Sequence, residues 1–185
     1  MVKVKPFTAK LNLETQMITI REASPADISI IQQIAYGSWP STYGEILSKE
    51  QLDYMLDKFY DSNALLDLMV NQWHFFILIY EDDFCLGFAS FEHHYLNQKT
   101  TRLHKIYLLP QAQGKGAGKL LIDTVVDFAK KNDSDAVSLN VNRFNKACSF
   151  YQKMGFEIIG EEDIELDQGF LMEDYKMEKS LINLL

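Results

Sequence analysis

The feature that most constrains the fold of this chain is a glycine-rich run that joins an apolar strand to an amphipathic helix. The run is Gln-Gly-Lys-Gly-Ala-Gly over residues 113–118. Residues 103–109 before it are mostly apolar and are stopped by Pro110, and apolar residues after it recur at helical spacing through Lys131. Because glycine has no Cβ, its backbone can turn tightly and approach a ligand closely. The pattern predicts a strand, a tight loop and a helix in direct succession.

A loop of this kind at the start of a helix is suited to hold an anion. The first turn of a helix leaves backbone N–H groups without intrahelical partners and carries partial positive charge. Lys115 and Lys119 add positive charge at the same place. Phosphate is the anion most often bound in this way, so we expect a phosphate-bearing ligand.

Three phosphate ligands compete for the loop. A nucleoside triphosphate loop needs Ser or Thr after a Gly-Lys pair, and this run has neither. A dinucleotide loop has the spacing G-x-G-x-x-G early in a βαβ unit, whereas the glycines here are spaced G-x-G-x-G after about the fourth strand. The pyrophosphate of coenzyme A is the third ligand. A glycine turn that binds nothing is the remaining alternative.

A second segment follows at a short distance. Residues 136–141 are typical of a buried strand, and a short helical segment follows them. Asn145 suits the N-cap of that helix and Gly155 suits the residue just after its end. Phe156 then begins another apolar strand. The segment predicts a strand, a short helix carrying Tyr151, and a further strand.

The two segments together resemble the signatures of the GNAT N-acetyltransferases. Gln113, Gly116 and Gly118 match the Q-x-x-G-x-G/A loop of that family, and the run from Asn145 to Phe156 is similar to its second signature. The resemblance implies an α/β fold with a central, mixed but mostly antiparallel sheet of about seven strands and flanking helices. It also implies a splayed acetyl-CoA cleft between residues 103–109 and 136–141. Residues 16–185 are then a single acetyltransferase domain, preceded by an N-terminal extension at 1–15.

The resemblance also implies roles for particular residues, with acetyl-CoA as co-substrate. Backbone groups of three residues would contact the acetyl group and the pantetheine: Ile106, Tyr107 and Leu108. Seven residues would hold the pyrophosphate: Gln113, Gly114, Lys115, Gly116, Ala117, Gly118 and Lys119. Asn145 would bond the pantetheine arm, and Tyr151 would be the general acid that protonates the departing thiolate. A phenol suits this task because it stays protonated at neutral pH and can donate a hydrogen bond. A core position is the alternative for Tyr151.

The sequence departs from the family pattern at two positions. The spacing from Asn145 to Tyr151 is shorter than in many members. Protein N-terminal acetyltransferases of this superfamily carry a glutamate where this chain has Asn140. Because an amide cannot act as a base, this position disfavours an N-terminal peptide as acceptor.

The acceptor amine must lose a proton before or during attack. His104 and Glu92 are the candidate bases, and a water relay would serve equally. No group of His, Cys, Asp or Glu has metal-ligand spacing, so we expect no metal site.

Other segments are similar to bacterial relatives of the spermidine/spermine N-acetyltransferases: Thr42-Tyr43 and residues 48–55, 103–107 and 174–177. This resemblance implies a small-molecule amine, such as a polyamine, as acceptor. We expect a helix from Pro25 to about Tyr36, then a loop over residues 38–47 in which Trp39 and Tyr43 form one wall of the acceptor pocket. Five acidic residues could line that pocket: Glu81, Glu92, Glu162, Asp163 and Asp174. Solvated strand ends and turns are the alternative for most of them.

Three other functions stay open. The chain could acetylate proteins or peptides, act as a non-catalytic acyl-CoA-binding sensor, or use a different acyl donor such as succinyl-CoA. Each would keep the same loop and the same fold.

Composition limits the partners. The net charge of −8 argues against nucleic acid, and the 185 residues suit a single core. No apolar run approaches the ~20 residues of a membrane span, and the N-terminus lacks the apolar centre of a signal peptide, so we expect a cytoplasmic protein without membrane contact. Dimers are common in the family, which makes a homodimer an option, although nothing in the sequence marks an interface.

Overall fold

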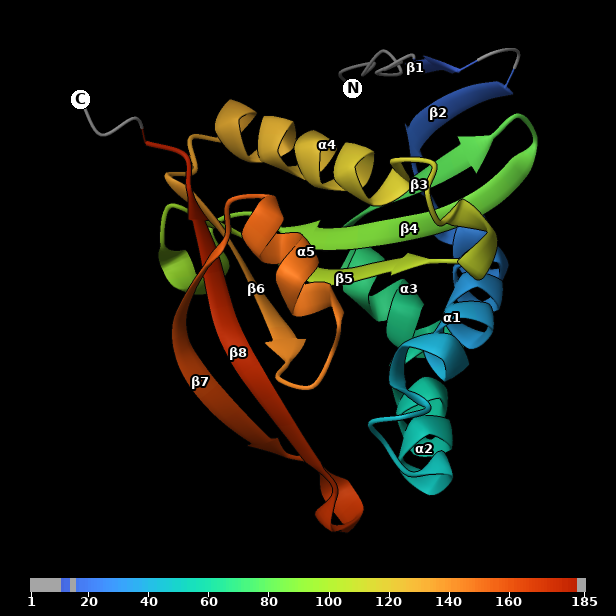
Figure 1. Cartoon of the computed structure of the whole chain (residues 1–185), viewed down its shortest axis with the longest axis vertical. Helices are drawn as coiled ribbons and strands as arrows, with labels where there is room; N and C mark the ends of the chain where they lie inside the picture. The colour runs from blue at the N-terminus through green and yellow to red at the C-terminus, as the bar shows by residue number, and fades with distance from the viewer. Residues whose placement is uncertain (1–10, 14–15, 183–185) are drawn as a thin grey trace.

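The computed structural model describes residues 11–13 and 16–182. They form one eight-stranded sheet with helices on both faces (Figure 1). The strands are β1 (Leu11–Leu13), β2 (Gln16–Glu22), β3 (Phe75–Glu81), β4 (Phe84–Glu92), β5 (Thr100–Leu108), β6 (Ala136–Asn142), β7 (Glu157–Glu165) and β8 (Leu171–Ser180). The helices are α1 (Ile28–Tyr43), α2 (Lys49–Phe59), α3 (Ser62–Val70), α4 (Ala117–Lys131) and α5 (Ala147–Lys153).

The strand order is β1-β2-β3-β4-β5-β6-β8-β7. All neighbouring strands pair antiparallel except β5 and β6, which pair parallel. The mixed, mostly antiparallel sheet confirms the predicted fold. The strand beyond the expected seven is β1, which lies in the predicted extension; residues 1–10 and 14–15 of that extension are outside the described part of the chain.

Each face of the sheet has its own core. Buried apolar residues of α4 and α5 pack on one face, with side chains such as Ile106 and Leu108 of β5 beside them. Buried residues of α1, α2 and α3 pack on the other face, together with Tyr107 of β5. Figure 1 shows α4 above β4 and β5, and α3 below them. The helices α4 and α5 therefore cover one face of the sheet, and α1, α2 and α3 cover the other.

The sheet is interrupted in its middle. β5 and β6 pair over only four positions, from Thr100 opposite Ala136 to Leu103 opposite Leu139. β5 continues to Leu108 and β6 to Asn142, but these ends have diverged. From His104 onward, the β6-facing edge of β5 therefore has no strand partner among the described residues. The predicted splay between these two strands is present.

The end of α1 differs from the expectation. Residues 39–43, expected to be a loop, form the last turns of α1, which continues to Tyr43 with Pro40 inside it. The expectation was wrong because Pro40, Ser41 and Thr42 are poor helix formers, whereas packing against the sheet holds the helix. Trp39 is 3% exposed within this core. The sequence indicated that the helix ends before Pro40, but packing against the sheet outweighs the low helix propensity of these residues.

Other helix ends follow the sequence signals. Ser48 caps α2 by accepting a hydrogen bond from the Gln51 N–H at 3.1 Å. Gly155 follows α5 at φ +85°, in the left-handed region that favours glycine. Within residues 11–13 and 16–182, no helix is both long enough and apolar enough to cross a bilayer.

Candidate functional site

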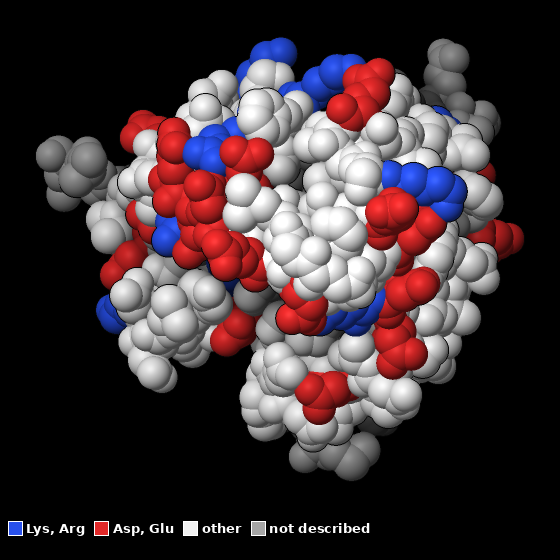
Figure 2. Space-filling model, turned by 90° about the horizontal axis from the view of Figure 1, so that it is seen from below, with Lys and Arg blue, Asp and Glu red and all other residues white. Residues whose placement is uncertain are grey.

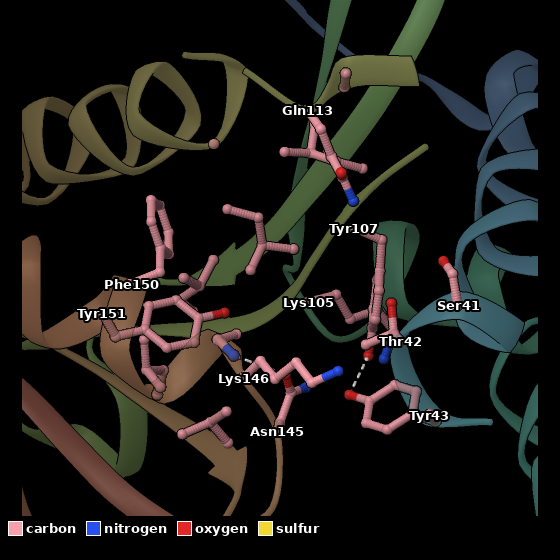
Figure 3. A pocket seen from close by; sticks show the side chains of 18 of the residues that line it. Ser41, Thr42, Tyr43, Lys105, Tyr107, Gln113, Asn145, Lys146, Phe150 and Tyr151 are labelled. Atoms are coloured by element: carbon pink, nitrogen blue, oxygen red, sulfur yellow. Dashed lines mark hydrogen bonds between the residues drawn. The ribbon is translucent and has the colours of Figure 1, made fainter. Parts of the chain in front are cut away.

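A cavity of about 580 Å³ opens where β5 and β6 separate. Its walls come from four parts of the chain: the end of α1, the second half of β5, the loop before α4, and the segment from the end of β6 to α5 (Figure 3). Elements far apart in sequence therefore meet around one space. The volume is typical of a small-molecule or cofactor site.

The glycine loop forms one end of this cavity. Gly114 and Gly116 line it with φ of +76° and +71°, and a Cβ built at either position would meet no atom within 4 Å. Both glycines are exposed, so the space beside them is open. Gly118 has a different role, because a Cβ there would lie 3.3 Å from Leu108 and from Phe150, so it permits close packing of α4.

The start of α4 presents free backbone donors to this end of the cavity. The first N–H with an acceptor inside the helix is that of Leu120, bonded to the Gly116 carbonyl at 3.0 Å. The N–H groups of residues 117–119 precede it and have no such acceptor. Gln113 and Lys119 also line the cavity, whereas Lys115 turns away and pairs with Glu81 at 2.5 Å. Ala117 is buried in the core at 1% exposure.

The middle of the cavity runs along the free edge of β5. Ile106, Tyr107 and Leu108 line it, and their partner strand on the other side is β4. Because β6 has diverged here, backbone groups on the cavity side of β5 are available to a ligand. An extended ligand could add to this edge as a further strand would.

Tyr151 and Asn145 come from the segment after β6. Tyr151 is 8% exposed and its ring lies in the cavity wall with the hydroxyl pointing inward (Figure 3). The described residues provide no hydrogen-bond partner for this hydroxyl, and burial raises its pKa. The N-cap of α5 is Lys146 and not the predicted Asn145, which lies one residue earlier and accepts a hydrogen bond from the Ala147 N–H through its Oδ1 at 2.8 Å. Its Nδ2 is left for another acceptor.

The opposite wall is aromatic. The Tyr43 hydroxyl lies 3.2 Å from the Tyr107 hydroxyl, and both tyrosines line the cavity (Figure 3). Trp39, one helical turn before Tyr43, packs behind it with ring centroids 4.9 Å apart. Of the two predicted wall residues, Tyr43 therefore reaches the cavity and Trp39 supports it from the core. Burial raises the pKa of both tyrosines, so they are neutral near neutral pH.

His104 and Glu92, the two base candidates, are hydrogen-bonded to each other. The His104 Nε2 lies 3.0 Å from the Glu92 carboxylate, and His74 Nε2 lies 3.5 Å from the same oxygen. Burial lowers the pKa of His104 to about 2 and that of His74 to about 4, and it raises the pKa of Glu92. His104 lines the cavity. Both imidazoles are thus uncharged at neutral pH.

Sequence spacing did not indicate that His74 would join this pair. The ligand atoms of the three side chains lie within 4.8 Å of one another, which is close enough to consider a metal ion. The two imidazoles are stacked, however, with centroids 4.3 Å apart and planes 16° apart. The Nε2 atoms of both rings approach the same oxygen of Glu92. The sequence expectation of no metal-ligand group did not anticipate this cluster, in which His104 is hydrogen-bonded to Glu92.

A β-bulge next to His104 sets the direction of Lys105. Ser90 of β4 pairs with Lys105, but the next residue, Phe91, pairs with Leu103, which leaves His104 as the extra residue. Lys105 lies on the same face as Tyr107, because both contact the ring of Tyr60. Lys105 lines the cavity and was not among the predicted site residues. Its signal in the sequence is a lysine inside an otherwise apolar half-strand.

The five acidic residues suggested by the sequence are not in the cavity wall as the described residues define it. Four of them are paired: Glu81 with Lys115, Glu92 with His104, Glu162 with Lys176 and Asp163 with Arg143. Asp174 is 6% exposed, and burial raises its pKa to about 6. The acidic residue that does line the cavity is Glu45, which is exposed and lies 3.2 Å from Lys146. Asn140 also lines it and donates to Glu162 at 2.9 Å.

Comparison with known proteins gives a consistent result. The family model described as "Acetyltransferase (GNAT) family" matches residues 31–156. An uncharacterized N-acetyltransferase of Bacillus subtilis, YuaI, is 28% identical over 179 residues, which cover 90% of this chain and 99% of that protein. The spermidine N(1)-acetyltransferase of Thermoplasma acidophilum is 29% identical over 161 residues, covering 84% of this chain and 96% of that protein.

A solved structure matches as well. The PaiA N-acetyltransferase of Thermoplasma acidophilum in complex with coenzyme A superimposes with a TM-score of 0.74 at 27% sequence identity. The match covers 88% of this chain and 98% of that chain.

Proposed function

The chain belongs to the GNAT acetyltransferase family, and from that premise we propose that it transfers an acetyl group from acetyl-CoA to the primary amine of a small molecule. The observation that carries the proposal is the cavity at the β5–β6 divergence, with the glycine loop at one end and the Tyr151 hydroxyl directed inward. The catalytic unit we propose is residues 16–185, with residues 1–15 as an extension.

The residues present fit coenzyme A. The open space beside Gly114 and Gly116, which have no side chain to fill it, suits a pyrophosphate close to the backbone. The unpartnered N–H groups at the start of α4 supply donors and positive potential. Gln113 and Lys119 add side-chain contacts, and the free edge of β5 at Ile106 to Leu108 suits the pantetheine arm. When bound, acetyl-CoA supplies an acyl group activated as a thioester.

Tyr151 is the general acid of the proposal. Its hydroxyl faces the cavity without a protein partner among the described residues, and its raised pKa keeps it protonated. A protonated phenol in this place can donate its proton to a departing thiolate sulfur. Asn145 lines the cavity, and we propose that its Nδ2 bonds the pantetheine arm. His104 and Glu92 are proposed as base candidates on the strength of their place beside β5.

We propose a polyamine as the first class of acceptor to test. A related protein 29% identical is named as a spermidine acetyltransferase. Acidic side chains visibly outnumber basic ones on the face seen in Figure 2, which would attract a polycation. Glu45 lines the cavity, and we propose that its carboxylate binds a second ammonium group of the polyamine.

The test is thiol release from acetyl-CoA with a panel of amines: spermidine, spermine, shorter diamines, amino acids and an N-terminal peptide. Saturable release that is strongest with a polyamine is expected. Saturable release with the peptide alone would overturn the small-molecule acceptor in favour of a protein. Tight acetyl-CoA binding by calorimetry without release from any amine would favour a sensor role or another acyl donor.

A further inference from the structure

Lys105 differs from the other lysines of the cavity wall in having no ionic partner. Lys119 pairs with Asp123, and Lys146 pairs with Glu45. Within the described part of the chain, no carboxylate or hydrogen-bond acceptor lies within bonding distance of the Lys105 ammonium. Its neighbours are the rings of Tyr60, with the centroid 5.6 Å from Nζ, and Phe59, at 6.0 Å. Lys105 is half-buried, and an ammonium group partly removed from water without an anion is costly.

The position of Lys105 relates it to the acceptor amine and not to coenzyme A. The proposed pyrophosphate site lies with α4 and α5, on the face of the sheet that carries Ile106 and Leu108. Lys105 points to the other face, toward α2 and the aromatic wall that contains Tyr107. It is also adjacent in sequence to Ile106, whose backbone is proposed to contact the acetyl group. An amine approaching the acetyl group from the α1–α2 side would pass this lysine (Figure 3).

The surroundings of Lys105 favour an uncharged amine. Burial lowers the pKa of Lys105 to about 8, so a substantial fraction is neutral near physiological pH. The titratable groups that face it are His104 beside it on β5, His74 before β3, and Tyr60 after α2, and all three are uncharged near neutral pH. Tyr43 from α1 and Tyr107 from β5 are neutral as well. None of these groups supplies an anion that would restore the ordinary lysine pKa.

We propose that Lys105 is the general base that deprotonates the acceptor, an assignment that rests on the proposed acetyltransferase function. The neutral Lys105 amine accepts one proton from the acceptor ammonium and becomes an ammonium group. The freed amine forms a C–N bond to the thioester carbonyl carbon, and the C–S bond breaks. The sulfur takes the proton of Tyr151, the acylated nitrogen returns its second proton to the Tyr151 phenolate, and Lys105 releases its proton to water.

His104 and Glu92 suit this step less well. The Nε2 of His104 is held at 3.0 Å from the Glu92 carboxylate, and an imidazole with a pKa of about 2 is a weak base. Base catalysis is most effective when the pKa of the base lies near the working pH. Lys105 meets that condition and faces the cavity.

The test uses Lys105→Met, Lys105→Arg and His104→Gln, with Lys49→Met as a control at a lysine side chain that is 86% exposed outside the cavity. Two acceptors are compared at the same pH: spermidine, whose amines are protonated, and trifluoroethylamine, a weakly basic amine that is mostly unprotonated. Calorimetry with acetyl-CoA and circular dichroism confirm that each variant is folded and binds the donor.

Both Lys105 variants are expected to lower kcat/KM for spermidine by about 10²- to 10⁴-fold, the usual contribution of a general base, and to keep most activity toward trifluoroethylamine. Lys105→Arg retains the cation and much of the packing but cannot become a neutral base. In the wild type, kcat/KM for spermidine should rise through about pH 8, and both variants should lose that rise.

Other outcomes overturn the assignment. If Lys105→Arg lowers kcat/KM equally for spermidine and trifluoroethylamine, the role of Lys105 is structural. If it lowers kcat/KM only for the amino acids of the wider panel, Lys105 binds the carboxylate of the acceptor. Loss of the pH-dependent rise in His104→Gln but not in Lys105→Arg would move the base to His104. If the wild-type protein acetylates no amine, the proposed function fails, and the role of Lys105 fails with it.

Discussion

Replacing Gly116 by alanine separates the folding role of the glycine loop from its binding role. Gly116 has φ +71°, and a Cβ there would meet no protein atom within 4 Å. The folding cost is therefore backbone strain alone, about 1–2 kcal/mol for a residue with a side chain in the left-handed region. For a chain of 185 residues this corresponds to a fall in Tm of roughly 2–8 °C.

Gly169 provides the matched control. It has φ +76°, and a Cβ there also meets nothing within 4 Å, but it lies between β7 and β8 and not in the cavity wall. Gly169→Ala should lower Tm by a similar amount and leave acetyl-CoA binding unchanged. A difference in acetyl-CoA affinity between the two variants would then arise from the position of Gly116 in the cavity wall and not from backbone strain.

In Gly116→Ala the added methyl group occupies volume proposed for the pyrophosphate. Losing one hydrogen bond to a charged group costs about 1.5–3 kcal/mol, so Kd for acetyl-CoA should rise about ten- to hundredfold. Isothermal calorimetry measures Kd, and a thermal melt of each variant measures Tm. Equal Kd values for Gly116→Ala, Gly169→Ala and the wild type would refute the assignment of the loop to the pyrophosphate.

Two further predictions concern the general acid and the stability of the N-terminal part of the domain. Tyr151→Phe should keep acetyl-CoA affinity but lower kcat by about 10²- to 10⁴-fold, because only the proton donor is lost; unchanged kcat in steady-state assays would remove Tyr151 from the mechanism. Asp27→Asn should lower the free energy of unfolding by about 1–2 kcal/mol at pH 7, since the Arg21 guanidinium holds the pKa of Asp27 at about 2. That contribution is fully present above the ordinary Asp pKa and is lost as the pH falls toward 2, so urea titrations at pH 7 and pH 3 should show the difference shrinking, and a constant difference would contradict the linkage.

The sequence by itself determined the local units of this protein. The glycine run predicted a tight loop before a helix, and the structure has that loop with positive φ at Gly114 and Gly116. The Ser48 side chain accepts a hydrogen bond at the start of α2, and the Asn145 side chain accepts one just before α5, each from an N–H two or three residues further along the chain. These features depend on residues that are near neighbours in the chain, so the pattern alone contains the necessary information. The order of these units was enough to indicate the family and the divergence of β5 from β6.

The tertiary structure decided which side chains reach the cavity. The continuation of α1 through Pro40 placed Tyr43 in the wall and Trp39 behind it. The bulge at His104 and the pairing of β4 with β5 turned Lys105 toward the aromatic wall, and the same arrangement brought His74 to Glu92. Each outcome depends on strand register and on packing between residues distant in sequence, and a shift of one residue in register exchanges the faces of a strand. Local sequence patterns therefore predicted the glycine loop before α4, whereas only the folded sheet brought Lys105 into the cavity wall.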